Sequence, residues 1–337
     1  MIETIGSHLW SYLTLFGLGL LIWAALSPFE TLGWWAGWFG DKIYVNQPSV
    51  DPKTDQEPLS DMTQIEAPLQ EPGKAMLMTQ PQCYVLFLSG VGRVSSEIVS
   101  YREKNFLEHL TAALPQAEII DDVFPYAVNN LALTGQPFFA RIWRWSLRRK
   151  INGPRLMGNL INLRNIWQIL VSADRRYGPI FNQGMAEVIM HSLLRHNYKP
   201  GTDTPVFVIG YSGAGQMAVG SAEYLKEWIQ APLQIITLGG VFSSNPGLLA
   251  ADHTYNLYGS KDRVYKAYLL APGRWPIFMT SEWNRVRRQG RATDVVLGPM
   301  EHTGAGGYLD GKRTLADGTP FVERTAEIIA GLVRRGS

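Results

Sequence analysis

A serine between glycines follows a short apolar stretch, in the sequence Pro-Val-Phe-Val-Ile-Gly-Tyr-Ser-Gly-Ala-Gly at positions 205–215. The β-branched and aromatic residues at 206–209 predict a buried strand, and from Gly213 onward the pattern is that of a helix. A serine on a tight turn between a strand and a helix projects its hydroxyl clear of the sheet, and the first N–H groups of the helix lie where negative charge would develop. The pattern therefore indicates a nucleophile at Ser212, and a glycine-rich turn with an incidental serine is the alternative.

Two later strand ends supply an acid and a base. A predicted strand at 254–258 leads into a turn with Asp262 at its tip, and a predicted strand at 294–298 leads into a loop that contains His302. In a catalytic triad the histidine takes the proton of the serine, and the carboxylate holds the imidazole in the required tautomer. We therefore expect Ser212, Asp262 and His302 to meet, although Asp262 is also a good turn-forming residue in its own right.

Other acids and histidines fit these roles less well. Asp252 precedes its expected strand and Asp294 begins one, so neither follows a strand end. Of the six histidines, His302 alone lies in a loop after a strand near the C-terminal end of the domain. His191 and His196 are five residues apart, which misses the spacing of a helical zinc pair, and the chain has no cysteine–histidine cluster. We therefore expect neither a metal nor an organic cofactor.

In the chain order of these residues the sequence resembles the α/β-hydrolase superfamily, and within it the lipases and esterases. The likeness runs from about Cys83 to the last predicted helix and includes the motif Gly-x-Ser-x-Gly, except that Ala214 stands at the second glycine. Independently of the resemblance, strands that alternate with helices predict an α/β fold with a mostly parallel sheet covered on both faces.

The resemblance also implies an oxyanion hole, which stabilises negative charge on the reacting carbonyl oxygen. One donor would be the backbone N–H of Gly213, and the other would be that of Val91, after an earlier predicted strand at 84–89. Related enzymes often have His-Gly where this chain has Ser89-Gly90. An ordinary turn between a strand and a helix is the alternative for this segment.

The N-terminal region differs sharply in composition from the rest. Residues 4–29 contain no Asp, Glu, Lys or Arg, and about 20 apolar residues are enough to cross a bilayer as a helix. The tryptophans within 32–40 suit the aromatic belt at a membrane surface. A cleaved signal peptide is the alternative, but no Lys or Arg precedes the apolar stretch. We expect a single-pass membrane anchor and interfacial segment at 1–45, with no charge bias that would orient it.

The remaining sequence predicts a linker and one large domain. Residues 46–82 are rich in Pro, Asp, Glu and Gln, which is typical of an extended or disordered linker. In a chain of 337 residues, 46% of them hydrophobic, residues 83–337 suffice for one large α/β domain. The alternation of strands and helices breaks at about 128–178, where the superfamily resemblance implies a helical cap.

The cap range is strongly basic. It carries nine basic residues against a single acid, Asp174. Arg141, Arg144 and Arg148 recur at helical spacing opposite apolar residues that include Trp143, a pattern typical of a helix on an anionic lipid surface. A cap with solvated arginines, whose apolar face covers the hydrolase core, is the alternative. The net charge of +2 and the lack of a recognition fold argue against nucleic acid as a partner.

Together these features predict a membrane-anchored serine hydrolase that cleaves a carboxylic ester of a lipid-like molecule. The expected partners are that substrate and the membrane. A thioesterase or acyltransferase with the same triad is the enzymatic alternative. The alternative from another class is a membrane-tethered interaction protein that has this fold and no activity. The departures at Ala214 and Ser89 leave room for that last alternative, and the complete triad argues against it.

Overall fold

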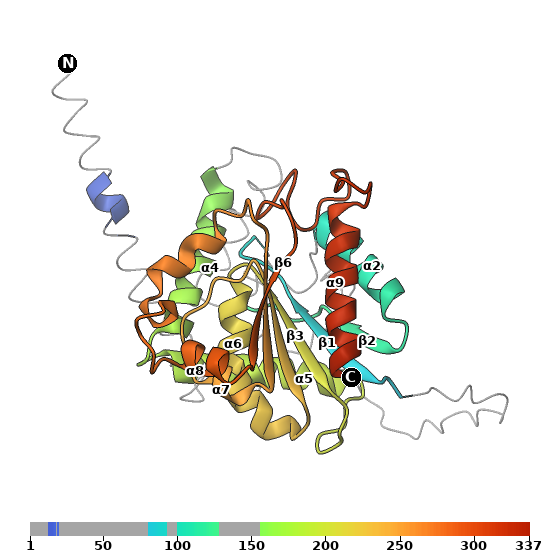
Figure 1. Cartoon of the computed structure of the whole chain (residues 1–337). Helices are drawn as coiled ribbons and strands as arrows, with labels where there is room; N and C mark the ends of the chain where they lie inside the picture. Colours follow the sequence, from blue (N-terminus) through green and yellow to red (C-terminus); the bar gives the residue numbers. More distant parts are fainter. Residues whose placement is uncertain (1–12, 18, 20–79, 93–99, 128–155) are drawn as a thin grey trace, which may run out of the picture.

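The structure, a computed structural model, describes residues 13–17, 19, 80–92, 100–127 and 156–337. Six strands form one sheet in the order β2-β1-β3-β4-β5-β6, and every neighbouring pair is parallel (Figure 1). The strands are β1 (Cys83–Leu88), β2 (Ala117–Ile120), β3 (Val206–Tyr211), β4 (Leu233–Leu238), β5 (His253–Tyr258) and β6 (Ala292–Val296). The protein therefore has an α/β fold with a parallel sheet, as the sequence predicts.

Helices cover both faces of this sheet (Figure 1). The α-helices are α2 (Tyr101–Ala113), α4 (Leu156–Ala173), α5 (Gly178–Arg195), α6 (Ala214–Ile229), α7 (Gly247–Ala250), α8 (Glu282–Arg288) and α9 (Phe321–Gly336). Two short 3-10 helices, η2 (Tyr265–Leu270) and η3 (Pro272–Arg274), lie between β5 and α8. Side chains of α4 to α8 share one hydrophobic core, and side chains of α2 and α9 share the other.

The two cores follow from the alternation of side chains along each strand. Leu86 and Val208 point into the core beneath α4 to α8, whereas Phe87 and Phe207 point into the core beneath α2 and α9. Strands β1 and β3 are buried along their whole length. Such central strands read as nearly continuous apolar runs, which is why the sequence pattern identifies them.

One strand lies slightly earlier than the sequence predicts. The expected strand at 294–298 is β6, which ends at Val296. Gly298 has a φ of 108°, a backbone conformation that leaves the extended region and favours glycine. The chain therefore turns off the sheet before the predicted end, and the loop toward His302 is correspondingly longer.

Part of the predicted cap belongs to the described chain. Helix α4 lies in the expected range 128–178, and its Arg164 is buried rather than solvated. The Arg164 guanidinium donates to the carbonyl oxygen of Tyr126 and to Oδ1 of Asn165. The predicted basic stripe of Arg141, Arg144 and Arg148 lies outside the described residues.

The predicted membrane anchor also falls almost wholly outside the described ranges, which include only residues 13–17 and 19 of the stretch 4–29. Within the part of the chain that the structure describes, none of the helices combines the length and apolar character that crossing a bilayer requires.

The strand order places a topological switch between β1 and β3. From β1 the chain crosses to β2 on one side, and it later returns to β3 on the other side. Where the connections from two adjacent strands lead to opposite sides, the segments that follow those strands diverge. Ligands of parallel sheets bind in the crevice between such segments. The segments after β1 and β3 contain Val91 and Ser212, respectively, so the topology brings these two residues to the same place.

A close approach between β3 and α6 shapes the turn that carries Ser212. A Cβ atom on Gly210 would lie 2.6 Å from the carbonyl oxygen of Ala214 and 2.7 Å from Cα of Gly215. A Cβ on Gly215 would lie 3.0 Å from Cα of Gly240, which follows β4. The start of α6 is therefore packed backbone to backbone against two strand ends.

We predict that Gly210→Ala lowers the free energy of unfolding by about 1–3 kcal/mol, because the added methyl group meets backbone atoms that cannot move aside. Gly331→Ala in α9 is the matched control, since a Cβ there meets nothing within 4 Å. Alanine is favoured over glycine inside a helix by about 0.5–1 kcal/mol, so this control should stabilise the protein. Denaturant unfolding measures both. Equal stability of Gly210→Ala and the parent protein would contradict the close approach.

Candidate active site

Ser212 occupies an unusual backbone conformation. Its φ of 57° lies in the left-handed region, which residues other than glycine rarely adopt. The backbone N–H of Ser212 donates to the carbonyl oxygen of Leu238 over 2.9 Å. Its own carbonyl oxygen accepts from the N–H groups of Gly215, at 3.1 Å, and Val241, at 3.0 Å. Bonds to the end of β4 and to the first turn of α6 thus hold the strained residue in place.

The structure brings Ser212, His302 and Asp262 together in a hydrogen-bonded row. Ser212 Oγ lies 2.7 Å from His302 Nε2, and His302 Nδ1 lies 2.8 Å from Asp262 Oδ2. The side chains are largely out of solvent, with exposed fractions of 7% for Ser212, 9% for His302 and 2% for Asp262. A carboxylate at Nδ1 fixes the proton there and leaves Nε2 to accept the serine proton. The arrangement can therefore activate the hydroxyl as a nucleophile.

Asp262 is held as a carboxylate by three donors. Besides His302, the hydroxyl of Tyr308 donates to Oδ2, and the backbone N–H of Tyr265 donates to Oδ1 over 2.9 Å. Burial raises the pKa of the Asp262 carboxyl, but the hydrogen bonds from His302, Tyr308 and Tyr265 outweigh it, so the pKa lies below its ordinary value. Asp262 is therefore ionised at neutral pH and faces the imidazole with a full charge.

The histidine reaches Ser212 by crossing the end of β4. At this crossing stands Gly239, with a φ of 56°. A Cβ on Gly239 would lie 2.6 Å from Cε2 of Tyr308, 3.0 Å from Asp262 Oδ2 and 3.1 Å from His302 Nδ1. The hydroxyl of Tyr211 donates to the backbone carbonyl of His302 over 2.9 Å. The missing side chain at Gly239 thus leaves room for the imidazole of His302. The hydrogen bond from Tyr211, the residue before Ser212, holds the backbone of His302 in place.

The two predicted oxyanion residues also lie at this site. A Cβ on Gly90 would lie 3.3 Å from Cβ of Ser212, and a Cβ on Gly213 would lie 2.9 Å from Cγ1 of Val91. Asn165 of α4 donates through Nδ2 to the carbonyl oxygen of Val91 over 2.7 Å. The turn after β1 is therefore packed against the Ser212 turn and tied to the helix above it.

Ser89, the residue before Gly90, has a structural role of its own. Ser89 is fully buried, and its hydroxyl donates to Oε1 of Glu103 in α2. The other carboxylate oxygen of Glu103 accepts from the backbone N–H and the hydroxyl of Ser100, the N-cap of α2. The hydroxyl of Tyr126 donates to the carbonyl oxygen of Ser89 over 3.1 Å. These bonds fix the turn after β1 without a histidine.

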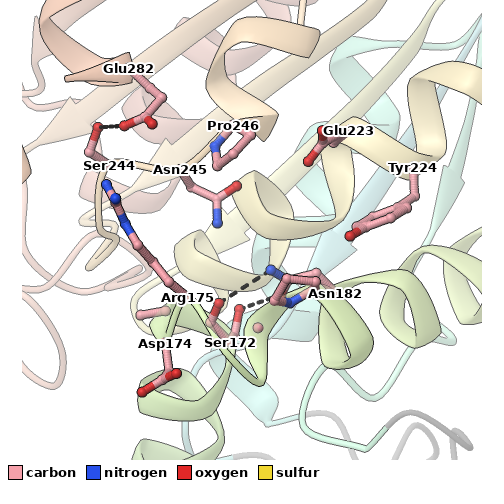
Figure 2. A pocket seen from close by; sticks show the side chains of 13 residues that line it. Ser172, Asp174, Arg175, Asn182, Glu223, Tyr224, Ser244, Asn245, Pro246 and Glu282 are labelled. Atoms are coloured by element: carbon pink, nitrogen blue, oxygen red, sulfur yellow. Dashed lines mark hydrogen bonds between the residues drawn. The ribbon is translucent and has the colours of Figure 1, made fainter. Parts of the chain in front are cut away.

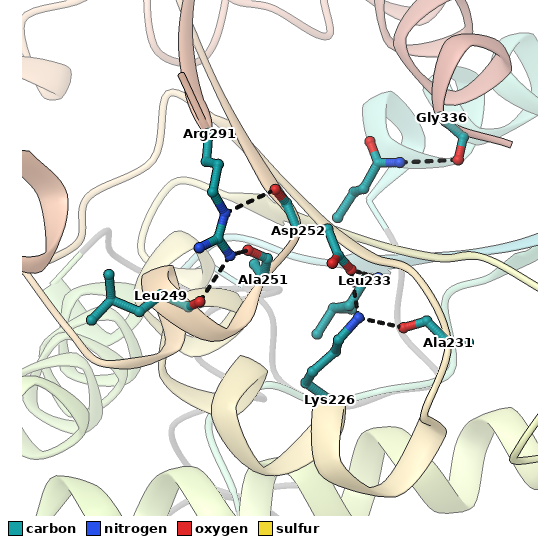
Figure 3. Close-up of polar contacts among 9 residues, drawn as sticks. Lys226, Ala231, Leu233, Leu249, Ala251, Asp252, Arg291 and Gly336 are labelled. Atoms are coloured by element: carbon teal, nitrogen blue, oxygen red, sulfur yellow. Dashed lines mark hydrogen bonds and ion pairs between the residues drawn. The ribbon is translucent and has the colours of Figure 1, made fainter. Parts of the chain in front are cut away.

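Both alternative acids are engaged elsewhere. Asp252 precedes β5 and so lies at the N-terminal ends of the strands, whereas Ser212 follows the C-terminal end of β3. Its Oδ2 lies 2.6 Å from Nζ of Lys226 and 2.7 Å from the backbone N of Leu233 (Figure 3). Asp294 accepts from Nδ2 of Asn256 over 2.7 Å and pairs with Arg287 at 3.3 Å. Neither carboxylate is bonded to His302.

Several positioning residues could not be named from the sequence. Tyr308, Tyr211 and Asn165 make the contacts that orient Asp262, His302 and Val91, respectively. Tyr211 directly precedes the serine and Tyr308 follows the histidine by six residues, but no motif marks either tyrosine. Across the described ranges, no group of three or more His, Cys, Asp or Glu side chains could hold a metal ion.

A separate cavity of about 280 Å³ lies between the C-terminal end of α4 and helices α5, α6 and α8. Its lining includes the polar side chains of Ser172, Asn182 and Glu282, and Arg175 extends toward Glu282 (Figure 2). Gln216, one turn after Ser212, donates to the hydroxyl of Ser172 over 3.3 Å. None of the three residues of the hydrogen-bonded row lines this cavity.

The chain matches no protein-family model, and no curated protein matches its sequence. The chemistry of the site therefore rests on its own geometry.

We predict that Tyr308→Phe destabilises the protein in a pH-dependent way. The loss of the hydroxyl leaves the Asp262 carboxylate one donor short, so its pKa rises toward the ordinary value of about 3.9. A carboxyl with a lowered pKa stabilises the fold above its ordinary pKa, and this stabilisation is lost as the pH falls through its folded value. The difference in unfolding free energy between parent and variant should therefore stay constant from about pH 7 to about pH 5 and narrow as the pH falls below about 4.

Tyr211→Phe is the matched control, because the Tyr211 hydroxyl donates to a backbone carbonyl and not to a titrating group. Its difference from the parent should stay constant over the same range. Denaturant melts at each pH measure both variants. A constant difference for Tyr308→Phe would show that Tyr308 does not support the Asp262 charge.

Proposed function

We propose that the protein is a serine hydrolase of the α/β-hydrolase type that cleaves a carboxylic ester of a lipid-like molecule. The observation that carries the proposal is the row Ser212–His302–Asp262, with hydrogen bonds of 2.7 and 2.8 Å and the serine on a strained turn between a strand and a helix. Strain at a residue other than glycine is characteristic of functional sites. The order of strands and the positions of the three residues at strand ends agree with that superfamily.

In this proposal Ser212 Oγ attacks the ester carbonyl carbon while its proton passes to His302 Nε2. Negative charge develops on the carbonyl oxygen, next to the backbone N–H groups of Gly213 and Val91. The carbonyl then re-forms, the bond to the alcohol breaks, and His302 returns the proton to the leaving oxygen. Water attacks the acyl-serine in the same way, which releases the acid and restores the serine. Asp262 keeps its charge throughout and stabilises the imidazolium.

The apolar surroundings of the turn support a lipid-like substrate. Ile169 of α4 lies directly over the Ser212 turn, since a Cβ on Gly213 would lie 2.2 Å from its Cδ1. Leu163, Ile166 and Leu170 of the same helix expose apolar side chains to solvent. These side chains could contact an acyl chain near the reacting carbonyl at little desolvation cost.

We predict that Ser212→Ala abolishes labelling by a fluorophosphonate probe and hydrolysis of p-nitrophenyl esters, while stability barely changes. His302→Ala should cost as much, because the members of a triad act as a unit. Asp262→Asn should lower turnover by up to roughly 10⁴-fold, because it impairs the base and leaves the serine in place. Esters of graded chain length, assayed with the purified protein, should show a preference for longer acyl chains.

Asp252→Asn is the matched control, since its carboxylate binds Lys226 at the N-terminal ends of the strands, away from Ser212. It should keep most of the activity. Full activity of Ser212→Ala would end the serine-hydrolase proposal. Retained activity in Asp262→Asn, together with loss of activity in Asp252→Asn, would assign the role of the acid to Asp252 and leave the rest of the proposal unchanged.

We further propose that the chain is anchored in a membrane by its N-terminal region. Because residues 4–29 carry no formal charge and are long enough to span a bilayer, the full-length protein should resist extraction by carbonate and by high salt. A truncated chain that begins near Gly73 should be released into the soluble fraction. Fractionation of cell membranes measures both. Recovery of the intact N-terminus in a detergent-free soluble fraction would rule out the anchor.

A further inference from the structure

The segment between β5 and β6 exposes a series of large apolar side chains. It leaves the sheet directly after Asp262 and runs through η2, η3 and α8 before β6 begins. Leu270 is 86% exposed and Ile277 is 75% exposed, which is unusual for side chains of this size. The exposed large apolar residues of this segment are Val264, Leu269, Leu270, Ile277, Phe278 and Met279.

These side chains are not the loose tip of a loop, because the segment is fixed from inside. Arg274 is 5% exposed, and its guanidinium lies 3.9 Å from the ring centre of Phe242 and 4.7 Å from that of Trp283. Asn284 of α8 donates through Nδ2 to the carbonyl oxygens of Trp275, at 2.8 Å, and Phe278, at 3.0 Å. The backbone is therefore pinned to the core while Leu270 and Ile277 point to solvent.

The same segment is basic on its surface. Its exposed charged side chains are Lys261, Arg263, Lys266, Arg285, Arg287 and Arg288. Its two acids are not freely exposed: Asp262 is buried, and Glu282 is half-buried and accepts a hydrogen bond from Ser244. Arg263, Lys266 and Arg285 make no ion pair with any residue of the described chain. The surface thus combines apolar side chains with an excess of positive charge.

This surface lies on the face of the sheet that α4 also covers. Val171 of α4 and Trp283 of α8 belong to one hydrophobic core, and Arg175, just after α4, extends toward Glu282 (Figure 2). In Figure 1 the segment after β5, drawn in orange, descends on the same side of the molecule as α4. Helix α4, in which Leu163, Ile166 and Leu170 are exposed, therefore lies on the same side of the molecule as this segment.

We propose that residues 263–288 form a docking surface for a lipid bilayer with anionic headgroups. Leu269, Leu270 and Ile277 would enter the boundary between headgroups and acyl chains, and the basic side chains would contact the anionic headgroups. The bilayer is favoured over the chain's own residues 128–155, because these carry six basic residues and no acid and would be repelled. The docked face would hold the Asp262 end of the catalytic row at the membrane. The proposal does not require hydrolase activity, so the two can fail separately.

The test uses the full-length chain with an environment-sensitive fluorophore at a single position. Cys83, the only cysteine, is buried, so Leu270→Cys can be labelled selectively. Leu194→Cys on α5 is the matched control, at a leucine that is 44% exposed and outside the proposed surface. The protein is studied with vesicles of phosphatidylcholine alone and with vesicles that also contain phosphatidylserine. Nitroxide-labelled lipid should quench the fluorophore at position 270 in the phosphatidylserine vesicles, and should leave position 194 unquenched.

Charge substitutions separate the lipid interaction from simple apolar adsorption. Each Lys or Arg near an anionic surface changes the docked-to-undocked ratio about fivefold, so Arg263→Gln, Lys266→Gln and Arg285→Gln together should lower it roughly 100-fold. The control pair Lys199→Gln and Arg335→Gln removes exposed charges elsewhere and should change little. Higher salt should weaken docking of the parent more than that of the triple variant, which keeps three exposed basic side chains on this surface.

Three results would overturn the proposal. One is equal quenching at positions 270 and 194 in the phosphatidylserine vesicles. Another is unchanged docking of the triple charge variant. The third is shielding of position 270 from an aqueous quencher in vesicles of phosphatidylcholine alone, without quenching by the nitroxide-labelled lipid, because another part of the chain or a second copy would then cover this surface. Fluorophosphonate labelling of the same samples reports on Ser212 independently, so loss of labelling with retained docking would reject only the proposed hydrolase.

Discussion

The site depends on the backbone packing at the junction of β3 and α6. Without a Cβ at Gly210 the first turn of α6 lies against the strand, and the chain must reverse direction within Ser212. A left-handed conformation at a residue other than glycine costs of order 1–3 kcal/mol and persists only when its surroundings over-determine it. Here the bonds to Leu238 and Val241 supply that constraint. The strain thereby aims the hydroxyl away from the sheet and toward His302.

The parallel sheet brings the other members of the site to the strained Ser212 turn. Because all strands run in one direction, the segments after β3, β5 and β6 emerge at the same edge. The intervening end of β4 would block the meeting if it carried a side chain, and Gly239 leaves the space that His302 and Asp262 fill. Burial raises the pKa of Asp262, but the hydrogen bonds from His302, Tyr308 and the Tyr265 N–H lower it below its ordinary value. Packing and electrostatics therefore support the same geometry.

The segment after Asp262 connects this site with the surface of the protein. Tyr265 donates to Asp262 through its backbone and begins η2, from which the exposed Leu269 and Leu270 follow. Arg274, held among aromatic rings, fixes the far side of the same segment. The residues that hold Asp262 in place and those that face solvent thus belong to one segment, which Arg274 fixes to the core. Contact of its outer side with a bilayer would need no rearrangement of the hydrogen-bonded row.

The sequence by itself predicted the α/β fold and the members of the row, because each is marked locally. A buried strand followed by a turn residue is readable within about ten residues, and Ser212, Asp262 and His302 each end such a pattern. The extent of β6 was predicted less well, since Gly298 ends the strand through its backbone conformation. The anchor at 4–29 and the stripe from Arg141 to Arg148 stay predictions, because the stripe lies outside the described residues and the anchor lies almost wholly outside them.

Only the tertiary structure decided what surrounds the row. The bonds from Tyr308 to Asp262 and from Tyr211 to His302 join residues 46 and 91 positions apart, and no local pattern records such contacts. The same holds for the exposure of Leu270 and Ile277: an apolar run predicts burial, and only the packing of Arg274 beneath the segment determines that these side chains face outward. Local sequence determines conformation and turn chemistry, whereas contacts between distant segments depend on how the whole sheet is assembled.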